Sequence, residues 1–305
     1  MTSIIVDPGV SDDDRRNALY AGDIFVHTGS RAIRDFVAFT REMVEDAFGG
    51  LDPETAQYDM EVEAYAAILA QLKPGFIHHP ESKRHLCAIL AEHGCDPELT
   101  YFDVPRLRTS TSDDYLTTGI AYAFHPHRDT WYSAPMMQVN WWLPIYDVVP
   151  DNVVAFHPAY FDKGVKNGSE HYNYYQWNRD SRALAASQIG EDTREQPKPE
   201  ELIDLDPQLR PVPPVGGMMV FSGAQLHSSV PNTSGRTRIS VDFRTVHRAD
   251  VENHIGARNV DSNCTGTTMR DYLRVSDLTR LPHEAVAPYD VGVPQELLRW
   301  AIYSG

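Results

Sequence analysis

Apolar residues recur at helical spacing in the first third of the chain. Over residues 30–48 they return every three or four positions with charged residues between them, which predicts an amphipathic helix that ends at Gly49-Gly50. Asp52-Pro53 is a typical start signal and predicts a second helix. A third helix is expected over residues 80–93, closed by Gly94.

From about Leu99 onward, shorter segments rich in β-branched and aromatic residues replace this pattern, as is typical of strands. The expected strands cover residues 101–107, 119–127, 137–143, 153–156, 218–221 and 236–246. Helices followed by strands predict a mainly β fold, in which helices pack on one face of an antiparallel sheet.

The segment 160–215 is polar and irregular and fits neither pattern. A connection of this length is either a functional lid or a decoration without a catalytic role, and the sequence leaves both open. We expect one domain over residues 1–305. Its parts are helical support in 1–98, a β core in 99–246 with the lid-like insertion 160–215, and a C-terminal extension in 247–305.

Composition narrows the possible partners. The hydrophobic content of 42% is that of a globular protein with a sizeable core. Lys and Arg number 27 against 43 Asp and Glu, so the net charge of -16 disfavours nucleic acid and anionic membranes as partners. No stretch approaches the roughly 18 apolar residues of a membrane span, and the N-terminus lacks a signal peptide's apolar run. We therefore expect a cytoplasmic protein; its oligomeric state stays open.

A candidate metal site begins at His127-Arg128-Asp129. Residues two apart on a strand project to the same side, so His127 and Asp129 can grip one cation. Alone, this pattern favours a surface turn, but His227 adds a third candidate ligand after a predicted strand. Two histidines and one carboxylate suit Fe(II) and leave adjacent positions open. Zinc would accept the same ligands, but its catalytic sites normally have a single open coordination position, which water occupies.

Polar and apolar residues alternate over residues 236–244. The odd positions are largely apolar and suit packing on the helices. The even positions, expected to face a cavity, are Arg236, Arg238, Ser240, Asp242 and Arg244. An open sheet with a solvated face would show the same alternation, but Arg238 and Ser240 close after His227 favour a carboxylate-bearing cosubstrate.

Together these residues resemble the Fe(II)/2-oxoglutarate-dependent dioxygenases, closest in pattern to the phytanoyl-CoA hydroxylase-like branch. The matching elements are His127-x-Asp129, His227 about a hundred residues later, and Arg238-x-Ser240. The resemblance implies a double-stranded β-helix, the cupin-like jelly roll, with iron held by the two histidines and the aspartate. It also implies that Arg238 and Ser240 bind the distal carboxylate of 2-oxoglutarate.

The implied activity uses Fe(II), 2-oxoglutarate and O2 to hydroxylate or otherwise oxidise a small organic substrate, with release of succinate and CO2. An amino acid derivative or a natural-product intermediate is the expected kind of substrate. Halogenating relatives carry Gly or Ala at the carboxylate position, so Asp129 favours a non-halogenating oxidation. Residues 157–160 depart from the family pattern, and the resemblance therefore does not identify the substrate.

Other polar and aromatic residues are weaker candidates. Gln138 and Asn140, on one face of the strand 137–143, are expected to bind cosubstrate or to hold water. The candidates for substrate contact are Trp131, Tyr132, Trp142 and Arg236, with core packing or a solvated charge as the plainer alternatives. His125 is expected to be structural. The competing functions are a metal-dependent cupin-like isomerase or hydrolase without 2-oxoglutarate, and a non-catalytic metabolite-binding jelly roll.

Overall fold

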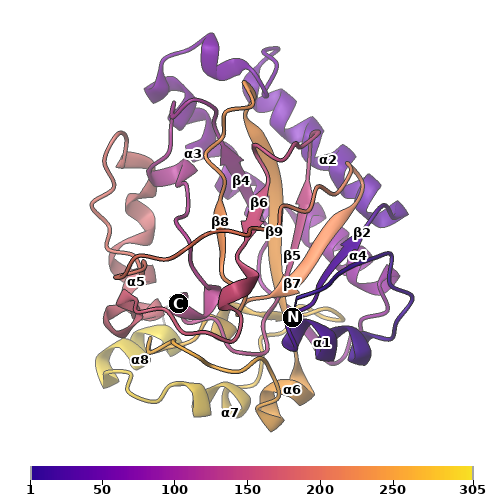
Figure 1. Ribbon diagram of the computed structural model, residues 1–305, viewed down its shortest axis with the longest axis vertical. Coiled ribbons are helices and arrows are strands. Elements are labelled where there is room, and N and C mark those ends of the chain that lie inside the picture. The colour runs from indigo at the N-terminus through magenta and orange to yellow at the C-terminus, as the bar shows by residue number, and fades with distance from the viewer. Residues whose placement is uncertain (1, 304–305) are drawn as a thin grey trace.

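A computed structural model describes residues 2–303 (Figure 1). The main sheet has the strand order β1-β2-β7-β5-β9-β3-β10, and β4 also pairs with β9. Its strands are β1 (Ile4–Val6), β2 (Ile24–His27), β3 (Thr100–Phe102), β4 (Arg106–Ser110), β5 (Val139–Pro144), β7 (Met218–Ser222), β9 (Arg238–His247) and β10 (Leu273–Arg274). A separate antiparallel pair joins β6 (Val154–Phe156) to β8 (His227–Ser229).

The long strand β9 organises the main sheet, because it pairs antiparallel with β3, β4 and β5. Its alternating pattern separates two environments. Ile239 and Phe243 belong to the core that is shared with the helices, whereas Arg238, Asp242 and Arg244 line a cavity. One face of the sheet therefore packs in the hydrophobic core, and the other face lines the cavity with charged side chains.

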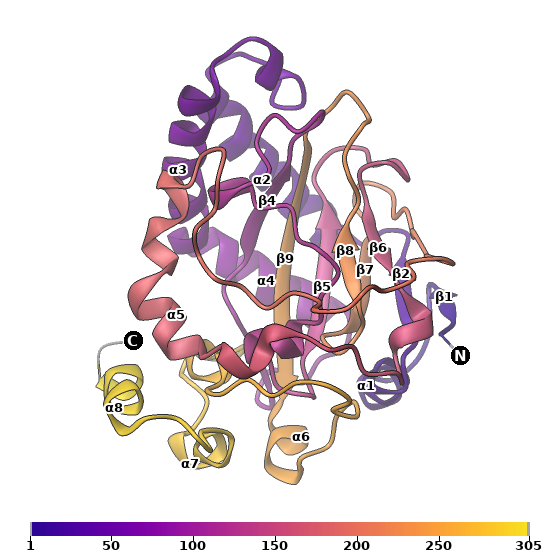
Figure 2. The same ribbon diagram turned by 60° about the vertical axis from the view of Figure 1, so that its left-hand side comes forward.

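Three long helices cover the apolar face of this sheet: α2 (Arg31–Phe48), α3 (Val62–His78) and α4 (Pro80–Glu92) (Figures 1 and 2). The side chain of Ser30 caps α2 by accepting from the Ile33 N–H at 3.1 Å, and Gly49 ends the helix in the left-handed conformation. The predictions for α2 and α4 agree with these bounds.

The predicted helix start at Asp52-Pro53 was wrong, because this segment forms turns and α3 begins ten residues later, at Val62. The carbonyl of Glu54 accepts from the Thr237 N–H at 2.7 Å. A carbonyl engaged by a neighbouring strand segment does not continue a helical ladder, and only the short 3-10 helix Ala56–Tyr58 follows.

Two strand predictions also need correction. Residues 119–127 do not form a strand: Gly119–Ala121 is a 3-10 turn, and only His127 pairs, in an isolated bridge to His227. Residues 101–107 split into β3 and the start of β4, separated at Pro105, which has no N–H to donate. In addition, the first third is not wholly helical, since β1 and β2 extend the sheet beyond β7. Strands of three and four residues carry too little pattern to be seen in sequence.

The remaining helices lie away from the α2–α4 layer (Figure 2). They are α1 (Asp12–Tyr20), α5 (Tyr174–Asp180) in the insertion, and α6 (Arg248–Asn253), α7 (His283–Val286) and α8 (Gln295–Tyr303) in the C-terminal extension. Within residues 2–303, no helix combines the length and apolar character needed to cross a membrane.

Candidate metal centre

His127, Asp129 and His227 converge, with potential ligand atoms within 4.8 Å of one another. Two backbone hydrogen bonds of 2.9 Å join His127 to His227. Asp129 begins a 3-10 turn, and its N–H donates to the Gly223 carbonyl at 3.0 Å. His127 and Asp129 therefore meet across a turn. The prediction that both lie on one continuous strand was wrong.

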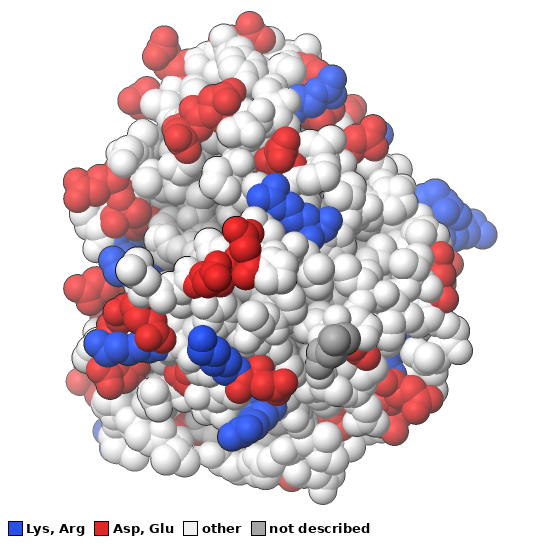
Figure 3. Space-filling view, viewed as in Figure 1, with Lys and Arg blue, Asp and Glu red and all other residues white. Residues whose placement is uncertain are grey.

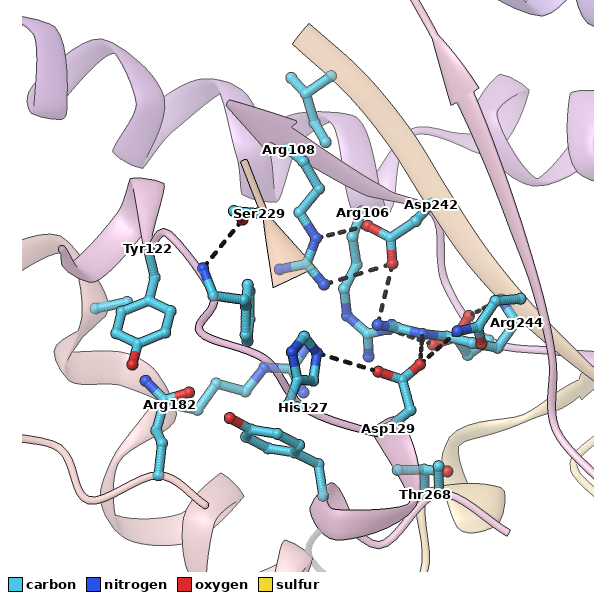
Figure 4. A pocket seen from close by; sticks show the side chains of 18 of the residues that line it. Arg106, Arg108, Tyr122, His127, Asp129, Arg182, Ser229, Asp242, Arg244 and Thr268 are labelled. Carbon is cyan, nitrogen blue, oxygen red and sulfur yellow. Dashed lines mark hydrogen bonds and ion pairs between the residues drawn. The ribbon is translucent and has the colours of Figure 1, made fainter. Parts of the chain in front are cut away.

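Backbone carbonyls orient both imidazoles. Nδ1 of His127 lies 2.8 Å from the His125 carbonyl, and Nδ1 of His227 lies 3.0 Å from the Gln225 carbonyl. A carbonyl can only accept, so each Nδ1 carries the proton and each Nε2 keeps its lone pair. Nε2 of His127 lies 3.6 Å from Oδ1 of Asp129 (Figure 4). Nε2 of His227 lies 3.9 Å from the same oxygen. This is the protonation pattern that a metal ion requires.

The carboxylate of Asp129 is held by two amides. Its Oδ2 accepts from Gln138 Nε2 at 2.9 Å and from Asn140 Nδ2 at 2.7 Å. Burial opposes ionisation, but the electrostatic influence of His127 and His227 and the hydrogen bond from Asn140 lower the pKa of Asp129 to about 2. Oδ1 is therefore the oxygen that faces the histidines. Gln138 and Asn140, expected from sequence to bind cosubstrate or to hold water, form hydrogen bonds with Asp129.

A cavity of approximately 450 Å³ opens beside the triad. Of the four residues predicted for substrate contact, Tyr132 and Trp142 line it. The other two lie elsewhere. The 3-10 turn directs Trp131 into a separate core, where its indole N–H donates to Asp261 at 2.8 Å. Arg236 precedes β9, is 61% exposed, and faces Glu54 at 3.5 Å. His125 is also exposed, with Nε2 2.5 Å from the Tyr122 hydroxyl.

Arg238 and Ser240 are buried and incompletely bonded. Nη1 of Arg238 donates to the Asn152 carbonyl at 2.9 Å, and its guanidinium lies 5.7 Å from the Trp142 ring centroid. Among residues 2–303, Nε of Arg238 and Oγ of Ser240 have no hydrogen-bond partner. Burial and the charge of Arg108 lower the pKa of Arg238 to about 10. Buried donors without acceptors are costly, so the Arg238 end of the cavity suits an anionic acceptor such as a carboxylate, whereas Ser240 is fully buried and is not among the residues that line the cavity.

The cavity also contains charged residues that the sequence analysis did not single out. Lys73, Asp103, Arg106 and Arg108 precede the insertion in the chain, and Arg182 and Arg194 belong to it. Asp242 accepts from Arg108 at 2.5 Å and pairs with Arg244 at 3.0 Å (Figure 4). The sequence could have indicated the two cavity arginines of β4, because they alternate with Leu107 and Thr109, as expected when one face of a strand is buried. The surface itself has no broad basic patch on the face in Figure 3.

The insertion 160–215 forms part of the cavity wall. It contributes aromatic, polar and basic side chains from α5 and from the segments on either side of it. These are Tyr172, Tyr174, Trp177, Asn178, Arg182, Ala185, Arg194 and Gln196. The C-terminal extension adds Thr268 and Tyr272, and the Tyr272 hydroxyl donates to Gln138 at 2.7 Å. Both segments thus contact the site, although neither carries a triad residue.

No family model and no curated protein matches the sequence. Among solved structures, EvdO2 from Micromonospora carbonacea var. aurantiaca in complex with 2-oxoglutarate is 12% identical, with a TM-score of 0.44 and coverage of 78% of this chain and 92% of that one. The epimerase SnoN in complex with Fe3+, alpha ketoglutarate and nogalamycin RO is 13% identical, with a TM-score of 0.40 and coverage of 86% and 98%. EctD from S. alaskensis is 15% identical, with a TM-score of 0.38 and coverage of 80% and 79%. Likenesses this distant do not carry a functional argument, which must come from the site. The solved structures that this chain resembles thus include one in complex with 2-oxoglutarate and one, an epimerase, in complex with Fe3+ and alpha ketoglutarate.

Proposed function

We propose that this protein is a non-haem Fe(II)- and 2-oxoglutarate-dependent oxygenase that acts on a small organic molecule. The observation that carries the proposal is one cavity that combines the His127–Asp129–His227 triad with a buried arginine whose Nε lacks an acceptor. The triad alone would also fit a cupin-like isomerase or a metal hydrolase. Neither of these needs Arg238, whereas a cosubstrate with a second carboxylate does.

In this proposal Nε2 of His127, Oδ1 of Asp129 and Nε2 of His227 hold the iron. Arg238 pairs with the distal carboxylate of 2-oxoglutarate, for which its planar fork is suited, and the Ser240 hydroxyl donates to the same group. When bound, iron with 2-oxoglutarate and O2 supplies the oxidant that removes a hydrogen atom from the substrate, with release of succinate and CO2. The presence of Asp129 favours hydroxylation or another non-halogenating oxidation.

Other residues position these groups. Gln138 and Asn140 fix Asp129, so that its second oxygen remains directed at the metal position. Trp142 lies against the Arg238 guanidinium, and the burial of this arginine strengthens its pairing with a carboxylate.

The proposal extends to the fold and its organisation. The main sheet and the β6–β8 pair would form the two sides of a double-stranded β-helix, because a shared apolar core that includes Trp142, Val154, Phe156 and Phe221 lies between them. Residues 1–305 would then form one oxygenase domain, with the insertion as part of its substrate-binding wall. The phytanoyl-CoA hydroxylase-like branch and a cytoplasmic location remain predictions.

The test is an anaerobic titration of the Fe(II)-loaded protein with 2-oxoglutarate, followed by visible absorption. We expect a saturable charge-transfer band between iron and the keto acid. At the same cosubstrate concentration the band should be lost in Arg238→Ala and kept in Arg236→Ala, a control on the same segment whose side chain is 61% exposed. A fully iron-loaded protein without a band would contradict the proposal and favour cupin chemistry.

A further inference from the structure

The cavity is basic although the chain as a whole is acidic. Seven basic side chains and three carboxylates line it, whereas the protein has a net charge of -16. The basic residues are Lys73, Arg106, Arg108, Arg182, Arg194, Arg238 and Arg244, and the carboxylates are Asp103, Asp129 and Asp242. Iron would add positive charge and 2-oxoglutarate would offset it. An excess of positive charge therefore remains, and it attracts anions into a concave site.

Most of these arginines have a carboxylate partner. The pairs are Arg106 and Arg244 with Asp103, Arg108 and Arg244 with Asp242, Arg244 with Asp129, and Arg194 with Asp192. Among residues 2–303, Lys73, Arg182 and Arg238 form no ion pair. Arg238 is assigned to 2-oxoglutarate by the proposed function. Lys73 and Arg182 are thus the two cations of the cavity that remain uncompensated.

Lys73 projects from α3 into the cavity. Its Nζ donates to the Thr109 hydroxyl at 3.1 Å and to the Ile120 carbonyl. Both acceptors are neutral, and the ammonium group has a third N–H. Burial, together with the charge of Arg108, lowers the pKa of Lys73 to about 7, against the opposing influence of Asp242. The empty site therefore disfavours the charged form of Lys73, and an anion beside Nζ would favour that form.

Arg182, an exposed residue of the insertion that lines the cavity, lies in a segment that packs on the turn containing Ile120. Ile120 belongs to the 3-10 turn Gly119–Ala121, which is covered by a second 3-10 helix, Arg182–Ser187. The approach is so close that a Cβ at Gly119 would collide with the carbonyl oxygens of Ala185 and Gln188. Figure 4 shows Arg182 on the side of His127 away from Asp129.

The rest of the wall is largely aromatic and reaches the metal ligands. Its rings are those of Tyr122, Phe124, Tyr132, Tyr172, Tyr174 and Trp177. Phe124 stacks on the His127 imidazole with centroids 4.8 Å apart, and Tyr132 meets the same ring edge-on at 5.4 Å. A molecule that fills the cavity would thus lie against aromatic surface next to the triad.

We propose that the substrate is an organic anion, a carboxylate or a phosphate ester with an apolar body, whose anionic group is bound by Lys73 and Arg182. This inference rests on the proposed function, because it assigns Arg238 to the cosubstrate. The ammonium and guanidinium groups provide charge-assisted hydrogen bonds. The aromatic wall covers the apolar body and leaves one of its C–H bonds facing the triad.

The test is anaerobic calorimetric titration of the protein saturated with Fe(II) and 2-oxoglutarate. The probes are 4-phenylbutyrate, phenethyl phosphate and the neutral 4-phenylbutyramide. We expect at least one anion to bind about 10-fold or more tightly than the amide, since hydrogen bonds to charged groups have this magnitude. Whichever anion binds more tightly identifies the group. The preference should disappear in Lys73→Met, return in Lys73→Arg, and persist in Lys166→Met, a matched control whose side chain is 72% exposed.

Three results would overturn this inference. They are equal binding of anions and amide by the wild type, a preference that survives Lys73→Met, and a loss of 2-oxoglutarate affinity in Lys73→Met, which would move Lys73 to the cosubstrate site. The charge-transfer band is recorded on the same samples. A normal band without anion preference contradicts the substrate inference alone, whereas a missing band in the wild type contradicts the proposed function.

Discussion

Asn140 Nδ2 lies 2.7 Å from Asp129 Oδ2, the carboxylate oxygen that does not face the histidines. The amide thus leaves Oδ1 free while it restricts rotation of the carboxylate. Hydrogen bonds of this kind around a metal ligand typically contribute 10- to 100-fold to metal affinity.

Replacing Asn140 by leucine, which has a similar volume, should therefore raise the Kd for Fe(II) by roughly 10- to 100-fold. Anaerobic competition with a metal-binding dye measures this change. Asn178→Leu is the matched control, because Asn178 lines the same cavity without a hydrogen bond to Asp129. Equal dissociation constants for both variants would show that the Asn140 amide does not support the metal site.

Metal removal should lower thermal stability. A ligand that binds only the folded state at 100 times its Kd stabilises that state by about 2.7 kcal/mol. We expect Fe(II) to raise the Tm of the wild-type protein under anaerobic conditions, and a chelator to reverse the shift. Asp129→Ala should show neither the shift nor substrate oxidation. A variant that keeps both would remove Asp129 from the ligand set.

Asp261→Asn should destabilise the loop that carries His127 and Asp129. Asp261 pairs at 3.0 Å with Arg128, which lies between two of the proposed ligands and is 1% exposed. Its other oxygen accepts from Trp131. A buried arginine left without its carboxylate costs about 3 kcal/mol, to be measured by urea unfolding. The control, Glu252→Gln, breaks an exposed pair with Arg248 and should cost less than about 1 kcal/mol. If the two substitutions lower the free energy of unfolding by similar amounts, burial of the Arg128–Asp261 pair does not explain its contribution.

Acid should destabilise the protein through His27. Burial, with the charges of His93 and Arg15, lowers the pKa of His27 to about 4 in the folded state. The unfolded chain, with a histidine pKa of about 6.5, binds the proton first. The stability that His27 provides is therefore complete above about pH 6.5 and is lost as the pH falls toward 4. By pH 5 the loss should reach about 2 kcal/mol.

Urea unfolding at pH 7 and pH 5 tests this dependence. His27→Phe should reduce the loss of unfolding free energy between the two pH values, whereas His171→Phe, at a side chain 75% exposed, should not. An unchanged pH dependence in His27→Phe would assign the acid sensitivity to other groups.

Local patterns were sufficient where a short segment determines its own structure. The Ser30 cap and Gly49 bound α2, and the alternation along β9 separates Ile239 and Phe243 from Arg238. The order of His127, Asp129, His227 and Arg238 predicted the kind of site, because ligand types and strand periodicity can be seen in sequence. The helix α2 and the strand β9 could be predicted because each depends on interactions between residues only a few positions apart.

The tertiary structure decided what depends on distant partners. The Glu54 carbonyl bonds to Thr237 instead of starting a helix, and Asp129 reaches the histidines through a turn held by Gly223. Lys73 meets Ile120 only after α3 packs on the sheet. Each of these contacts joins residues far apart in the chain, and their energies depend on burial and on which donors remain unpaired. Those quantities exist only in the folded molecule, so the sequence by itself determined the triad and the main helices, whereas the charge balance of the cavity was decided by the fold.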